Sequence, residues 1–225
     1  FATQEREFAQ KKLHNFVADV YESATVKPGK YTIELLEGIS ADNCIIQYCH
    51  KHPDVDCICI STRGAGKIKR IFGTNTGNLI TKSSVPVLAV PAAYRYKPVQ
   101  SVLYASDFKN LSQELEKVTA FAATFKAAVD VVHFTWPDET LPDAGTMQQA
   151  LKGKYRYGLK LVYEQTDAVQ TLVERLQKQV RLRKPGVVVM FTQQERTLFQ
   201  KIFLSSKTEE LSFSLKVPLL SVPKK

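Results

Sequence analysis

Residues 85–91 read VPVLAVP, and residues 217–223 read VPLLSVP, so one short motif occurs twice at an offset of 132 residues. A second matching pair lies upstream of it. CICIST at residues 57–62 corresponds to VVVMFT at residues 187–192, at an offset of 130. Ordered matches at a nearly constant offset indicate two copies of one module of about 130 residues.

Helical and strand-like patterns alternate within each copy. In the first copy we expect helices over residues 4–23, after Ser40 and over 76–82, and strands over 31–35, 56–60 and 85–90. In the second copy we expect strands over 101–105 and 129–134 and a helix over 112–127. This alternation predicts an α/β fold with two Rossmann-like domains and mostly parallel sheets, whose ligands bind at the carboxyl ends of the strands.

The repeat also predicts where the domains begin and end. We expect domain 1 over residues 1–96 and domain 2 over residues 97–225. Subtracting the offset from position 97 lands about 30 residues ahead of Phe1. Domain 1 is therefore expected to lack its first strand, first helix and second strand. The segment 137–158 is short for a full helix with its loops, so we expect either a shortened helix there or residues missing from this sequence around position 152.

Composition limits the class of protein. The chain has 225 residues, 44 % of them hydrophobic, and a formal net charge of +9. No apolar run approaches the ~20 residues of a membrane helix, no signal peptide is visible, and the four cysteines predict reduced thiols, so we expect a cytoplasmic protein. Five basic residues between 175 and 184 precede Pro185-Gly186. They favour a helix C-terminus over a nucleic-acid surface, and we expect no nucleic-acid partner.

The loop over residues 61–76, STRGAGKIKRIFGTNT, has the composition of a phosphate-binding loop. Its glycines let backbone N–H groups turn toward an anion, and Gly73-Thr74-Asn75 opens a helix with a positive N-terminus. Four basic side chains and no acidic one lie between positions 63 and 70. The loop does not fit the P-loop pattern. A solvated basic loop with turning glycines is the alternative.

These segments together resemble the universal stress protein family in its tandem two-domain form. The resemblance rests on the Thr-Arg-Gly sequence at 62–64, the Gly-Thr pair at 73–74 and the SVPVLAVP ending at 84–91. Nucleotide-binding members carry Gly-x-x-Gly, nine residues, then Gly with Ser or Thr. This chain departs from that pattern at Ser61, where a glycine is expected, and has eight residues between its glycines.

The resemblance implies an adenine nucleotide alpha-hydrolase-like fold that binds ATP or another adenine nucleotide in domain 1. The residues expected to hold it there are Thr62, Arg63, Gly64, Gly66, Gly73, Thr74 and Asn75. It further implies that the two Val-Pro-x-Leu-x-Val-Pro strands pair antiparallel inside the chain, which acts alone or as a homodimer.

Asp107 is the second family signature. It follows the strand over 101–105, where the family's aspartate contacts the adenine and ribose of ATP; capping of the next helix is the alternative. The glycine loop of domain 2 is replaced by a stretch with Glu195 and by Ser205-Ser206, so no nucleotide is expected in domain 2.

Catalytic and metal motifs are poor in this sequence. Cys57 and Cys59 form no Cys-x-x-Cys pair, and the histidines, including His133, favour surface or core positions over a catalytic base. We therefore expect a non-enzymatic ligand-binding or signalling protein of stress adaptation. An ATPase of the same fold and a scaffold with decayed nucleotide sites are the alternatives.

Overall fold

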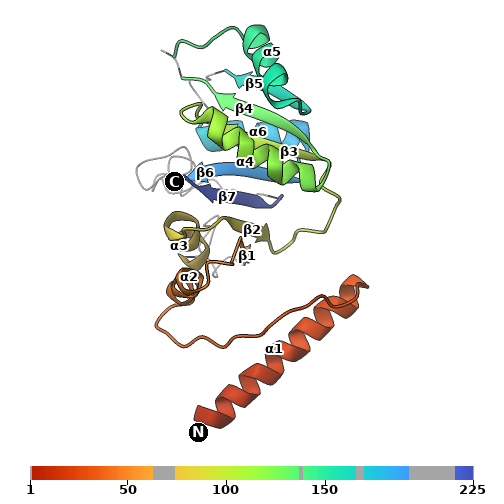
Figure 1. Cartoon of the computed structure of the whole chain (residues 1–225), viewed down its shortest axis with the longest axis vertical. Helices are drawn as coiled ribbons and strands as arrows, with labels where there is room; N and C mark the ends of the chain where they lie inside the picture. The colour runs from red at the N-terminus through yellow and green to blue at the C-terminus, as the bar shows by residue number, and fades with distance from the viewer. Residues whose placement is uncertain (1, 63–73, 137–138, 166–169, 193–215, 225) are drawn as a thin grey trace. The chain divides into compact units, whose positions relative to one another are not determined.

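The computed structural model describes residues 2–62, 74–136, 139–165, 170–192 and 216–224 (Figure 1). Contacts divide the chain into two compact units, Phe1–Cys44 and Ile45–Lys225, which are described separately. The division falls inside helix α2 (Ala41–Lys51). The expected domain boundary between residues 96 and 97 stays a prediction.

The first unit consists of helix α1 (Ala2–Ala24) and an extended segment. The helix agrees closely with the expected range of 4–23. Tyr21 ties the two parts together, because its hydroxyl accepts a hydrogen bond from the Gly29 amide at 3.3 Å and its ring lies 6.0 Å from that of Tyr31. The strand expected over 31–35 is wrong: those residues form no ladder. Alternating polarity makes a strand only where another strand supplies its hydrogen bonds.

The second unit is built on one seven-stranded sheet. Its strands are β1 (Ile58–Thr62), β2 (Val87–Pro91), β3 (Ser101–Ser106), β4 (Ala128–Phe134), β5 (Leu159–Glu164), β6 (Val187–Thr192) and β7 (Leu219–Pro223). Their order is β1-β2-β7-β6-β3-β4-β5. The five strands β3 to β7 are parallel, and numbered within the second copy they read 3-2-1-4-5 from β5, the doubly wound order.

Strands β2 and β7, which carry the two Val-Pro-x-Leu-x-Val-Pro motifs, pair antiparallel, as the family resemblance implies. Leu88 lies opposite Leu220, and Ala89 opposite Leu219. This reversal has a consequence for function. The carboxyl ends of β1 and β2 emerge at one edge of the sheet, and those of β3 to β7 emerge at the opposite edge.

Both faces of the second copy's sheet are buried. Along β3, Val102 and Tyr104 pack in one cluster with α4 (Leu111–Thr124) and α5 (Ala144–Tyr155). Leu103 and Ala105 pack in the other, with α3 (Thr74–Lys82) and α6 (Leu172–Arg183). Burial on both faces explains why the centres of β3 and β6 read as continuous apolar runs rather than as alternating sequences.

The helices of the second copy have defined ends. Thr171 and Glu174 form a reciprocal capping box at the start of α6, and Asp143 caps α5 by accepting a hydrogen bond from the Thr146 amide. Lys184 ends α6 in the left-handed conformation, with φ 48°. At 12 residues, α5 is about half the length of the 23-residue α1, so it is shortened as expected.

Candidate ligand cleft and buried ion-pair network

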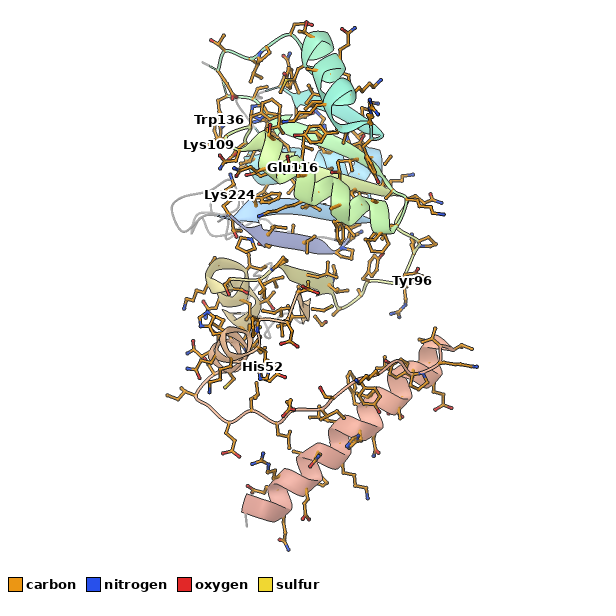
Figure 2. The ribbon with its side chains drawn as sticks, viewed as in Figure 1. His52, Tyr96, Lys109, Glu116, Trp136 and Lys224 are labelled. Carbon is orange, nitrogen blue, oxygen red and sulfur yellow. The ribbon has the colours of Figure 1, made fainter. Side chains whose placement is uncertain are left out.

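A cleft of about 740 Å³ opens at the carboxyl ends of β3 and β4. One wall is the β3–α4 connection with the first turn of α4, and the other is the segment before α5 with one residue of α5 itself. The lining residues are Asp107–Gln113, Glu139–Pro142 and Met147. Figure 2 shows Lys109, Trp136 and Lys224 at this same edge of the sheet. This is the edge at which open α/β sheets bind ligands.

Asp107 at this edge is already engaged by a cation. The Lys224 ammonium lies 3.2 Å from its Oδ1 and 3.1 Å from its Oδ2. The Lys109 amide donates to Oδ1 at 3.1 Å. The N-cap position of helix α4 is Asn110, not Asp107, and the Asn110 side chain makes no capping hydrogen bond. The capping role considered for Asp107 is therefore wrong.

Lys224 joins Asp107 to a buried polar network. Its ammonium lies 2.9 Å from Glu114 Oε1, and the side chains of Lys224 and Glu114 are each only 4 % exposed. The Tyr104 hydroxyl donates to Glu114 Oε2, and the Ser106 hydroxyl donates to the Tyr104 oxygen at 2.9 Å. One ammonium thus neutralises part of two carboxylates, and a phenol and a hydroxyl complete the network.

The network shifts two pKa values in the same direction. Burial, together with the charge of Glu114, raises the pKa of Tyr104 far above its ordinary value. Burial of the Lys224 ammonium lowers its pKa, but hydrogen bonds and attraction to Glu114 and Asp107 outweigh burial and raise the pKa overall. At neutral pH the network therefore holds a neutral phenol and a charged ammonium.

A second polar pair lies beside the cleft. His133, on β4, is 2 % exposed. Its Nδ1 lies 2.9 Å from the Ser106 carbonyl oxygen, and its Nε2 lies 2.9 Å from each carboxylate oxygen of Glu139. The Phe108 ring stacks on the imidazole at 4.1 Å, and Phe108 takes a left-handed φ of 61°. His133 is a core histidine, one of the two placements that the sequence left open, and its carboxylate partner was not foreseen.

The structure describes three of the residues expected to bind phosphate. Thr62 ends β1, and Thr74 and Asn75 begin α3. Arg63, Gly64, Gly66 and Gly73 lie outside the described residues. Of the described residues, Thr62 and Asp107 lie at opposite ends of the strands, because β1 and β3 run in opposite directions, and β2, β7 and β6 lie between these two strands.

The basic residues near position 180 are largely used inside the fold. Arg175 is buried and donates to the carbonyl oxygens of Thr135 and Glu164. Lys178 pairs with Glu164 at 2.8 Å, and Arg183 pairs with Asp130 at 3.1 Å. Three of the five basic residues thus hold α6 to the sheet.

Sequence reasoning missed Lys224, Glu114 and Glu139. One signal was present: Lys224 directly follows the strand motif at 217–223, at the edge where Asp107 follows β3. The sequence spacing does not predict that Glu114 contacts Lys224, because this contact depends on how α4 packs across the sheet. Within the described ranges, no three His, Cys, Asp or Glu side chains form a metal-binding group, and no helix is long and apolar enough to cross a membrane.

Solved structures share this fold. A universal stress protein from Archaeoglobus fulgidus DSM 4304 matches with a TM-score of 0.71 and 18 % identity, over 98 % of this chain and 78 % of that one. A protein from Pseudomonas aeruginosa UCBPP-PA14 assigned to the universal stress proteins matches with a TM-score of 0.55 and 15 % identity, over 95 % and 78 % of the two chains. A protein of unknown function from Pseudomonas aeruginosa PAO1 matches with a TM-score of 0.56 and 15 % identity, over 95 % of this chain and 77 % of that one.

Sequence comparison adds no closer relative: no family model and no curated protein sequence matches the chain. The structural matches alone identify the fold. The chain has the α/β fold of universal stress proteins, with a mostly parallel seven-stranded sheet.

Proposed function

We propose that this chain is a cytoplasmic universal stress protein that binds an adenine nucleotide in its first copy and signals by binding rather than by turnover. The fold shared with the Archaeoglobus fulgidus protein supports the stress-response assignment. The nucleotide assignment rests on one observation, the connection between β1 and α3. A strand that ends at Thr62 and a helix that starts at Thr74 flank three glycines, four basic residues and no acidic residue.

That connection has the chemistry an anion requires. It leaves the carboxyl end of a parallel strand and enters a helix at its positive end, where unpaired backbone N–H groups can bind phosphate oxygens. The glycines keep side chains away from these N–H groups. The basic residues add attraction that depends on salt concentration.

The second copy is proposed to bind no nucleotide. Asp107 would have to accept hydrogen bonds from ribose hydroxyls, but both its oxygens are bonded to Lys224 and one also to the Lys109 amide. Displacing a buried ammonium would leave the charges of Asp107 and Glu114 uncompensated. This same observation favours the second candidate function, a scaffold whose nucleotide sites have decayed.

Titration of the full-length protein with labelled ATP tests the assignment. Gly73→Val should weaken binding about tenfold or more, because the side chain keeps phosphate away from the backbone. Gly77→Val is the matched control in α3, since a Cβ there meets nothing within 4 Å, and it should bind like the parent. Asp107→Asn should also bind like the parent. Loss of binding in Asp107→Asn with none in Gly73→Val would reverse the assignment.

Two further measurements separate the alternatives. Denaturing the purified protein and weighing the released small molecules should reveal an adenine nucleotide; its absence, together with no binding in the titration, would favour the scaffold. Phosphate release from ATP should stay at the background rate. Release that Gly73→Val abolishes would instead indicate an ATPase.

A further inference from the structure

The two edge strands of the sheet, β5 and β1, are protected differently (Figure 1). On β5, the Gln148 side chain from α5 donates to the Leu159 carbonyl oxygen at 2.9 Å and accepts from the Leu161 amide at 2.6 Å. Lys160 adds an exposed charge to the same strand. Occupied backbone groups and a charge both prevent another strand from pairing with an edge. The β5 edge is therefore closed to further strands.

The β1 edge has neither kind of protection within the described part of the chain. Its sequence, ICIST, contains no charged residue, proline or glycine, and among the described strands it pairs with β2 alone. On that side the Ile58 amide donates to the Pro86 carbonyl oxygen at 2.8 Å. The backbone groups of the next residue, Cys59, therefore point the other way, out of the sheet. An edge of this kind is a template for one more strand.

The internal repeat shows which strand fits this edge. Strand β6 is the counterpart of β1 at an offset of 130 residues. The Val188 amide donates to the Pro218 carbonyl oxygen at 2.9 Å, which repeats the bond made by Ile58. The other side of β6 is occupied by β3, which runs parallel to it with Leu103 opposite Val188. By this correspondence, the strand that fits the open side of β1 is apolar and parallel to β1.

One face beside the β1 edge is uncovered as well. Cys59 is exposed, whereas its counterpart Val189 is 1 % exposed in the cluster under α4. Leu88, opposite Cys59 on β2, is only partly buried, whereas its counterpart Leu220 is 5 % exposed. The reverse face is different, because Ile58 there is buried in the core. A helix placed like α4 is thus what would cover the face that carries Cys59.

We propose that the β1 edge and the face carrying Cys59 together bind a partner segment made of an apolar strand followed by an amphipathic helix, as in β3–α4. The strand adds parallel to β1, and the helix covers Cys59 and Leu88. Main-chain hydrogen bonds supply affinity in strand addition, and side chains supply specificity. A second copy pairing β1 with β1 is the competing occupant. It would close the edge but leave the exposed faces of both copies side by side without a helix.

The partner's helix differs from α4 in one respect that the chain itself defines. Glu114 of α4 is buried against Lys224, the residue that follows β7. The residue that follows β2 at the equivalent place is Ala92, at an offset of 132. A carboxylate at the Glu114 position would therefore be buried there without a cation, which is costly. The partner's helix carries an uncharged residue at that position.

A labelled peptide of residues 99–125, which spans β3 and α4, is the probe for this site. It carries Glu114→Leu, and also Tyr104→Phe because the Tyr104 hydroxyl loses its acceptor. Fluorescence anisotropy should show that the peptide binds the parent protein. Mass spectrometry should show that it slows alkylation of the exposed thiols of Cys57 and Cys59 about tenfold or more, and leaves that of Cys44 unchanged. The peptide that keeps Glu114 should bind about tenfold more weakly.

Two substitutions at one exposed position separate docking at this edge from non-specific adhesion. Cys59→Val should keep peptide binding, because valine is the residue of β6 at that place. Cys59→Lys should weaken binding about tenfold or more, because it puts a charge under the covering helix. Equal binding by the two variants would overturn the proposal. A parent that sediments as a dimer and binds no peptide would overturn it too, and would assign the edge to a second copy. No nucleotide is needed, so the result does not depend on the proposed function.

Discussion

At the scale of single residues, Lys224 is the side chain on which most of the polar core depends. It comes from the residue after β7, yet it reaches two carboxylates, on the β3–α4 connection and on α4 itself. Removing a buried ammonium leaves its partners' charges unpaired, and this costs far more than losing a surface pair. The network thereby makes the position of β7 depend on charge as well as on packing.

We predict that Lys224→Met lowers the free energy of unfolding by about 3 kcal/mol, since the loss of one partner of a buried pair strands the other. Lys178→Met is the matched control; Lys178 is 47 % exposed in its pair with Glu164, and its loss should cost less than about 1 kcal/mol. Urea denaturation of both variants measures this. Equal costs would contradict the buried network.

The pH dependence of that difference has a defined sign. Because the folded pKa of Lys224 lies above its ordinary value of 10.5, its contribution is complete below pH 10.5 and is lost as the pH rises through the folded pKa. The difference in the free energy of unfolding between the parent and Lys224→Met should therefore be constant from about pH 7 to 9. It should narrow only in more alkaline solution. Urea midpoints across this range check it.

At the scale of elements, helix α6 has a residue in a defined capping conformation at each of its two ends. The Thr171 hydroxyl oxygen accepts a hydrogen bond from the Glu174 amide, and the Glu174 carboxylate accepts one from the Thr171 amide. At the other end, Lys184 occupies a left-handed conformation that glycine adopts without steric cost. Thr171 therefore suits the N-terminal end of α6, whereas Lys184 is strained at the C-terminal end.

Substitutions at the two ends should have opposite signs. Thr171→Ala should lower stability by about 1 kcal/mol by removing the cap, and Lys184→Gly should raise it by about 0.5 kcal/mol by relieving the left-handed residue. Asn110→Ala, at a helix start without a side-chain cap bond, should change little. Thermal unfolding of the three variants checks the order; a destabilised Lys184→Gly would contradict it.

How far the sequence predicted these elements depended on where their partners lie. Strands β3 and β4 were predicted to within one residue at each end, because both are rich in apolar residues and are bounded by turn residues, whereas β5 was not predicted. The strand expected over 31–35 failed since its alternation gives no information about a pairing partner. The polar partners of Asp107 and His133 were missed for the same reason. Lys224 and Glu139 reach these two residues only through contacts across the fold.

At the scale of the whole molecule, the antiparallel pair β2–β7 joins the two copies into one sheet. Among the described strands it is the one junction between copies, and its three pairs of residues include Leu88 with Leu220. Leu220 is 5 % exposed and packs on the α4 side of the sheet, whereas Leu88 is only partly buried there. At this pair, the side chain from β7 is therefore more deeply buried than the side chain from β2.

A charge at the junction should separate the copies. Leu220→Asp should lower the midpoint of thermal unfolding strongly, and Leu88→Asp should lower it less, because the first charge is the more deeply buried and neither has a partner. Leu182→Asp, at a position 67 % exposed on α6, should unfold like the parent. Unfolding of both junction variants at the parental temperature would refute the pairing as a stabilising contact.

The β2–β7 pair also orders the events of folding. Leu88 and Leu220 are 132 residues apart in the chain, so closing that loop costs about 4 kcal/mol of chain entropy before any hydrogen bond of the pair repays it. The parallel strands β3 and β4 are joined by the crossover through α4, a much shorter loop to close, and can nucleate early. Strands β1 and β2 therefore join a template that the second copy has already built, and they leave it first when the protein opens.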